Sequence, residues 1–167
     1  MKKLCAYFWT EERLWLLFLL GSLGLVIAAF IFEYGFDAKP CKMCWEQRYG
    51  HWGMVAAGLV GLKLPVSFLW KRFMLLTPVL WSGYVAVYQT LGQLGLVELP
   101  ASCRGNAATL SGASDLLSSF KDFKAAPDCA AVDFTILGLS FAQWNAIVML
   151  GFVLVIAATF FLKPKVK

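Results

Sequence analysis

Five cysteines carry most of the chemistry that this sequence offers, and two of them, Cys41 and Cys44, form a Cys-x-x-Cys pair. Pro40 precedes the pair and Arg48 follows Cys44 by four residues, one helical turn. Proline suits the first turn of a helix, and the N-terminus of a helix favours a thiolate. On a helix that turns about 100° per residue, Arg48 lies about 40° from Cys44 and His51 about 20° to the other side. This pattern predicts a reactive Cys44 thiolate beside a fixed cation, suited to electron transfer to a lipid-soluble acceptor.

A second pair, Cys103 and Cys129, is separated by 25 residues rich in small and polar side chains. As a structural disulfide it would stabilise the fold by roughly 3 kcal/mol. The segment offers little core to lock such a bond, which argues against a purely structural role, since a strained or exposed disulfide is the exchangeable kind. Zinc is disfavoured because the second pair lacks zinc-knuckle spacing, and haem because no Cys-x-x-Cys-His occurs. We therefore expect no metal site.

Alternatives stay open for three of these side chains. Arg48 would snorkel to the interface if Cys41–Cys44 were an inert bridge, although an ionisable residue in a membrane span is a functional candidate by default. His51 is either a satisfied polar anchor or a proton shuttle on the face of Cys44. Cys5 is an incidental thiol or a lipidation site.

The rest of the chain has the composition of an integral membrane protein. It has 167 residues, of which 60% are hydrophobic and 15% are charged, and its mean hydropathy is +0.69. A soluble domain carries about a quarter charged residues. Long apolar runs predict a single all-α domain over residues 1–167, a bundle of four transmembrane helices, with the first span retained rather than cleaved as a signal peptide. The predicted spans are residues 14–32, 45–62, 73–91 and 144–162. Nothing in the sequence favours nucleic-acid binding.

Four spans leave two loops, residues 33–44 and 92–143, on one side of the membrane. The termini and the turn at residues 63–72 hold nine Lys and Arg against two acids, and the other side holds six against eight. The positive-inside rule places both termini in the cytoplasm and both cysteine pairs outside it. Residues 114–124 are predicted to form a short amphipathic helix, which lies at the membrane interface or packs against the spans. Gly53, Ala57 and Gly61 recur every fourth residue and favour close packing of another helix.

Taken together, these features resemble the DsbB-type disulfide bond formation proteins of bacterial inner membranes. The resemblance covers nearly the whole chain. It includes four spans, the Pro-Cys-x-x-Cys with its arginine, the second cysteine pair in the long outer loop, and Gly138-Leu139 and Gln143-Trp144 before the last span.

The resemblance implies a disulfide-generating thiol:quinone oxidoreductase. A periplasmic thioredoxin-fold oxidase, DsbA-like, would react at Cys103, and Cys129 would exchange with the Cys41–Cys44 pair. Cys44 would pass electrons to ubiquinone or menaquinone, which Arg48, Cys44 and His51 would bind. Four cysteines allow three pairings. We expect Cys41–Cys44 with Cys103–Cys129, and a Cys41–Cys129 bridge as an intermediate.

Three other functions remain as alternatives. The residues inside Cys-Lys-Met-Cys and the composition of the long loop leave room for a paralogue dedicated to a specialised oxidase. An outward-directed disulfide reductase is disfavoured because no span interior contains cysteine. A non-enzymatic scaffold stapled by two disulfides leaves Arg48 unexplained.

Overall fold

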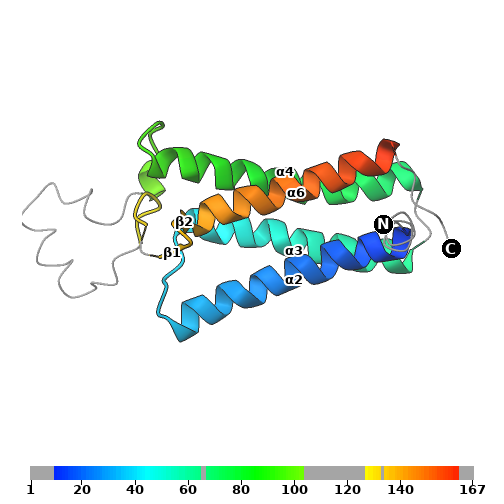
Figure 1. Cartoon of the computed structure of the whole chain (residues 1–167), viewed down its shortest axis with the longest axis horizontal. Coiled ribbons are helices and arrows are strands. Elements are labelled where there is room, and N and C mark those ends of the chain that lie inside the picture. The colour runs from blue at the N-terminus through cyan, green and yellow to red at the C-terminus, as the bar shows by residue number, and fades with distance from the viewer. Residues whose placement is uncertain (1–9, 65–66, 104–126, 133, 162–167) are drawn as a thin grey trace, which may run out of the picture.

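Four long helices form the body of the protein (Figure 1). The computed structural model describes residues 10–64, 67–103, 127–132 and 134–161. The helices are α2 (Glu11–Gly35), α3 (Lys42–Lys63), α4 (Phe68–Gln93) and α6 (Phe141–Phe161). A 3₁₀ turn, η1 (Ala101–Cys103), and a hairpin of β1 (Thr135–Ile136) and β2 (Leu139–Ser140) complete the described elements. The predicted helix at residues 114–124 and Cys5 lie outside the described residues.

The helices overlap the four predicted spans and extend beyond most of their ends. α2 continues through Glu33 to Gly35, and α3 begins at Lys42, so Cys44 lies in its first turn. A helix can pass from lipid into the interface without a break because it satisfies its own backbone hydrogen bonds. Glu33, which the sequence places in a loop, is therefore a helical residue facing the start of α3.

Two of the described helices are long and apolar enough to cross a membrane by length and composition, over Glu12–Gly35 and Phe141–Phe161. Large apolar side chains are nevertheless exposed on all four helices, among them Leu20, Leu59, Trp81 and Leu150. Soluble monomers rarely expose such extensive apolar surface. The described surface is thus that of a membrane protein, while the boundaries of the four spans stay a prediction.

The core lies between the helices and draws on each of them. Its buried side chains are Trp15, Phe18, Met54, Ala57, Leu75, Val79, Met149 and Ile156. Small residues on α3 allow its neighbours to approach closely. A Cβ on Gly61 would lie 2.6 Å from the Trp15 ring of α2, and one on Gly53 would lie 3.0 Å from Pro78 of α4. The small residues noted in the sequence therefore face two different helices.

The hairpin sets the start of α6. Its antiparallel strands pair Thr135 with Ser140, and the turn between them uses positive φ at Leu137 (54°) and Gly138 (80°), which glycine adopts without strain. Ser140 Oγ accepts from the Gln143 backbone N–H at 3.3 Å, and Gln143 Oε1 accepts from the Ser140 N–H at 2.8 Å. This reciprocal pair is a capping box, and it fixes where α6 begins.

Candidate active site

All four loop and helix-start cysteines gather at the end of the bundle that carries the hairpin. Cys41 caps the N-terminus of α3, where its Sγ accepts from the Cys44 backbone N–H at 3.2 Å. Cys103 ends η1, and its carbonyl accepts from the Cys129 N–H at 2.9 Å. Cys41, Cys103 and Cys129 are buried in one apolar cluster, against which Cys44 packs. The fold thus joins two pairs that lie far apart in the sequence.

The sulfurs form a continuous run. Cys44 hydrogen bonds with Cys41, Cys41 with Cys129, and Cys129 with Cys103, and all four are thiols in the structure. Thiol–disulfide exchange requires the attacking sulfur to approach the sulfur that it attacks. Each neighbour in the run is therefore placed to exchange with the next.

Thiols with a lowered pKa and thiols with a raised pKa alternate along this run of sulfurs. The hydrogen bond with Cys41 lowers the pKa of the Cys129 thiol to about 6, while burial raises the pKa of Cys103 to about 12. At the inner pair, which precedes the predicted second span, the bond with Cys41 lowers the pKa of Cys44 to about 7. The hydrogen bonds with Cys129 and Cys44 raise the pKa of Cys41. Each pair thus contains one acidic thiol, which is the better leaving group.

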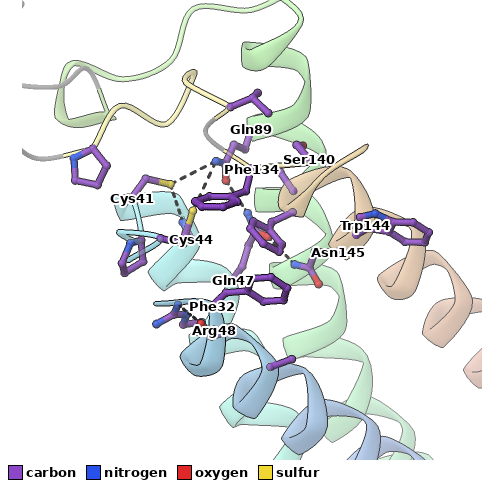
Figure 2. Close-up of a pocket in the computed structure, with 18 of the residues that line it drawn as sticks. Phe32, Cys41, Cys44, Gln47, Arg48, Gln89, Phe134, Ser140, Trp144 and Asn145 are labelled. Carbon is purple, nitrogen blue, oxygen red and sulfur yellow. Dashed lines mark hydrogen bonds between the residues drawn. The ribbon is translucent and has the colours of Figure 1, made fainter. Parts of the chain in front are cut away.

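Gln89 of α4 is the side chain that reaches both sulfurs of the inner pair (Figure 2). Its Nε2 lies 3.4 Å from Cys41 Sγ, 3.8 Å from Cys44 Sγ and 3.2 Å from the Cys129 carbonyl. It is buried, with 3% of its surface exposed. One amide therefore touches both cysteine pairs.

Arg48 is close to this centre but directed to α2. Its guanidinium forms an ion pair with Glu33 and donates to the Ala29 carbonyl at 3.3 Å. The rings of Phe30 and Trp45 lie 4.9 Å and 4.8 Å from its Cζ, within cation–π distance. The donor beside the Cys44 sulfur is thus Gln89, and the predicted stabilisation of that thiolate by Arg48 stays a prediction.

His51 lies one turn further along α3 and is buried, with 6% of its surface exposed. Its Nε2 is 3.0 Å from Asn145 Oδ1 of α6. Asn145 Nδ2 donates to Gln47 Oε1 at 2.7 Å, and Gln47 Nε2 donates to Gln89 Oε1 at 2.7 Å. A chain of polar side chains therefore connects His51 to the sulfurs.

A cavity of about 370 Å³ opens beside the inner cysteine pair. The C-terminal end of α2 splays away from the other helices (Figure 1), and α2 supplies one wall of the cavity. Apolar side chains form most of the lining: Leu25, Val26, Phe32, Phe134, Ile136, Phe141 and Val148. Its polar lining includes Cys44, Arg48, His51 and Gln89. A largely apolar space of this size with a few polar groups suits a flat ring with carbonyl oxygens.

Sequence reasoning found the cysteines, Arg48 and His51 but missed the partners that orient them. Gln89 and Asn145 each interrupt a run of apolar residues in a helix, and an uncharged amide there was a usable signal. Glu33 carried a weaker signal, because its role depends on α2 extending past the apolar run. The fold and site define a class of protein: a membrane-associated helical bundle that carries thiol–disulfide chemistry.

Comparison with known proteins identifies the family within this class. The family model for the disulfide bond formation protein DsbB matches residues 11–159. A disulfide bond formation protein B from Pasteurella multocida is 29% identical over 164 residues, which covers 93% of this chain and 92% of the relative. One from Aromatoleum aromaticum is 31% identical over 128 residues, covering 74% and 76%. One from Azoarcus sp. is 38% identical over 112 residues, covering 64% and 66%.

The chain belongs to the DsbB family, as its cysteine pattern predicted, and it is a membrane oxidoreductase of disulfide bond formation.

Proposed function

We propose that this protein is a thiol:quinone oxidoreductase that reoxidises a periplasmic DsbA-like dithiol oxidase. The observation that carries the proposal is the contact run of four sulfurs, which ends at Cys44 in the wall of an apolar cavity. In the net reaction, the partner dithiol and a quinone become the partner disulfide and a quinol. Two electrons and two protons move, and the protein returns to its starting state.

The first exchange takes place at the outer pair. A partner thiolate attacks Cys103 of a Cys103–Cys129 disulfide, which forms a mixed disulfide and releases Cys129 as a thiolate. The lowered pKa of Cys129 makes it the better leaving group, which supports attack at Cys103. The partner's second thiolate then breaks the mixed disulfide, forms the partner disulfide and releases Cys103.

The second exchange passes the electrons inward. The Cys129 thiolate attacks Cys41 of a Cys41–Cys44 disulfide, forms a Cys41–Cys129 bond and releases Cys44. The contact between Cys41 and Cys129 and the lowered pKa of Cys44 both support this direction. Cys103 then attacks Cys129, restores the outer disulfide and leaves the inner pair reduced.

The cavity would bind the ring of a quinone, which accepts two electrons and two protons from the inner pair. Cys44 lies in its wall as the electron donor. Arg48, held by Glu33 and two aromatic rings, would orient a carbonyl oxygen, and the apolar side chains would exclude water. His51 would contribute from the deeper part of the lining. Membership of the DsbB family supports a bacterial inner membrane, and the charge asymmetry of the loops supports periplasmic cysteine pairs and cytoplasmic termini.

The test mixes the full-length protein in detergent with a reduced thioredoxin-fold dithiol partner and a soluble quinone, and follows quinone absorbance. We expect reduction that Cys44→Ser abolishes and Arg48→Ala slows at least tenfold. Cys5→Ser, a cysteine change away from both pairs in the sequence, is the matched control and keeps the parental rate. Absence of quinone reduction with every partner tried, or full activity in Cys44→Ser, would overturn the proposal. Electron flow only from a cytoplasmic donor would instead support an outward-directed reductase.

A further inference from the structure

The side chain of Gln89 has more acceptors around it than it has hydrogens to donate. Its Nε2 carries two hydrogens and faces three acceptors: the sulfurs of Cys41 and Cys44, and the Cys129 carbonyl. The carbonyl cannot donate, so the nitrogen of the amide, and not its oxygen, must face the cysteines. One hydrogen remains for the sulfurs, and it will favour the sulfur that carries negative charge.

The oxygen end of the Gln89 amide is also fixed by hydrogen bonds. Gln47 Nε2 donates to Gln89 Oε1, and Gln47 Oε1 accepts from Asn145 Nδ2. Ser82 Oγ donates to the Gln47 carbonyl at 3.2 Å and accepts from Asn145 Nδ2 at 3.1 Å. Because the Ser82 hydrogen is committed to that carbonyl, the group of Asn145 that faces Ser82 must be the NH₂ group.

These fixed amide orientations set the direction of donation along the hydrogen-bonded side chains from His51 to Gln89. Asn145 Oδ1 can only accept, so His51 donates to it through Nε2–H at 3.0 Å. Donation therefore runs from His51 to Asn145, then to Gln47, then to Gln89 and finally to the sulfurs. Hydrogen bonds aligned in this way polarise one another, and each strengthens the donor that follows it. The positive end of the chain lies against the inner cysteine pair.

We propose that Gln89 is a positioning residue that supplements the hydrogen bond from Cys41 in stabilising the Cys44 thiolate, and that Asn145 and His51 strengthen its hydrogen bond through Gln47. The inference rests on the proposed function only in assigning Cys44 the role of electron donor. Because the amide donates to whichever sulfur is charged, it follows the negative charge to Cys44 when that sulfur is released from its disulfide.

Other charges surround the same sulfur and must stay constant in a test. Those from neighbouring elements are Cys41 and Arg48 on α3, Glu33 on α2, and Lys39, Asp128 and Cys129 in the segments that line the cavity or contact the sulfurs. Substitution of Gln89 by Leu removes the donor and leaves all of these in place. Substitution by Glu keeps the shape but places an acceptor, or a negative charge, against the sulfurs.

The experiment measures the alkylation of Cys44 in the fully reduced, full-length protein in detergent, without quinone or partner. Iodoacetamide is added at a series of pH values, and the modified Cys44 peptide is quantified by mass spectrometry. We expect Gln89→Leu to shift the midpoint of the Cys44 profile upward and to slow its alkylation at neutral pH about tenfold, since only the thiolate reacts. Gln89→Glu should slow it further. The limiting rate at high pH should rise by no more than about threefold, because a more basic thiolate is somewhat more nucleophilic, whereas a general loss of structure would raise it further.

Thr90→Val is the matched control. Thr90 is the next residue on α4, and among the described contacts its side-chain hydroxyl donates only to the Ala86 carbonyl of its own helix, at 2.8 Å. This variant should keep the parental profile. Asn145→Leu removes the hydrogen bond from Asn145 to Gln47. Like Gln89→Leu, it should slow Cys44 alkylation, but only about twofold.

A parental profile in Gln89→Leu, or an equal shift in Thr90→Val, would overturn the inference. Because this measurement uses no quinone, the proposed function can fail by its own test while the alkylation comparison still decides the role of Gln89.

Discussion

At the scale of single residues, the contacts between neighbouring sulfurs set the order in which the four cysteines can exchange. Cys41 contacts Cys44 on one side and Cys129 on the other, and both Cys41 and Cys44 line the cavity. Exchange between the pairs should therefore pass through Cys41. Cys44 remains free to face the acceptor because it is not the residue that joins the two pairs.

Selective crosslinking tests this arrangement. With Cys44→Ser and Cys103→Ser combined, mild oxidation by diamide should form the Cys41–Cys129 disulfide nearly completely, because those sulfurs are in contact. The matched variant combines Cys41→Ser with Cys103→Ser and leaves Cys44 with Cys129, which should join at least several-fold more slowly. Non-reducing peptide mapping measures both yields. Equal rates in the two variants would contradict the contact order.

The acidity of Cys44 predicts a pH dependence. Its pKa is lowered from 9.0 to about 7, with the Cys41 hydrogen bond as the largest cause, so the thiolate predominates above about pH 7. Single-turnover reduction of a soluble quinone by the prereduced protein should level off above this pH. Below it, the rate should fall about tenfold per pH unit as the thiol is protonated. Stopped-flow absorbance gives the profile, and a midpoint near 9 would show that the thiol is unperturbed.

At the scale of elements, α3 is the helix on which the site depends. It packs against both α2 and α4, and its glycines allow the close approach. Its first turn holds the inner cysteines, and its next turns hold the polar side chains that meet Gln89 and Asn145. A shift of α3 relative to α4 would separate Gln89 from the sulfurs.

Glycine substitutions test the packing. Gly61→Ala places a methyl group 2.6 Å from the rigid Trp15 ring, and we expect it to destabilise the protein by about 1–3 kcal/mol. Gly24→Ala is the control, since no atom lies within 4 Å of its added Cβ and the helix gains up to about 1 kcal/mol. Thermal unfolding in one detergent, followed by tryptophan fluorescence, should give a lower midpoint only for Gly61→Ala.

At the scale of the whole molecule, both cysteine pairs and the hairpin lie at one end of the bundle, and the turn between α3 and α4 lies at the other (Figure 1). Lys63, Lys71 and Arg72 flank this turn, and the charge count of the sequence predicts that both termini share its side of the membrane. The two ends should therefore face different compartments.

Impermeant labelling tests this orientation in a variant whose five cysteines are serine. Leu96→Cys, exposed near the cysteine end, should react with a membrane-impermeant maleimide in intact spheroplasts. Ser67→Cys, exposed at the opposite end, should react only after permeabilisation. Both should react equally in detergent, which controls for intrinsic reactivity. The reverse labelling pattern would invert the topology.

The sequence was sufficient for the helices and the family, whereas the reactive roles of the cysteines, Arg48 and His51 stay predictions. Cysteine spacing is a local property, and the apolar runs mark helices by length alone. The resemblance added the exchange between the two pairs, since no local rule relates Cys129 to Cys41. The contact between them depends on how η1 and the segment before the hairpin fold back over α3.

The orienting groups could not be derived in the same way. The sequence marks Gln89 as an amide that interrupts an apolar helix, but it does not tell which neighbour that face of the helix meets. The pairing of Arg48 with Glu33 was also hidden, because the apolar run predicted that the first helix stops at residue 32. Gln143 was visible as part of a motif, but its reciprocal capping with Ser140 appears only in the fold.

The ion pair between Arg48 and Glu33 has a consequence for what the cavity retains. A guanidinium that already has its counter-ion gains little from a small soluble anion, and displacing Glu33 would leave that carboxylate half-buried without its partner. The charges of Arg48 and Glu33 therefore cancel in the cavity before a ligand binds. The cavity should discriminate against phosphate or bicarbonate and release an uncharged product readily, as the proposed turnover with a membrane quinone would require.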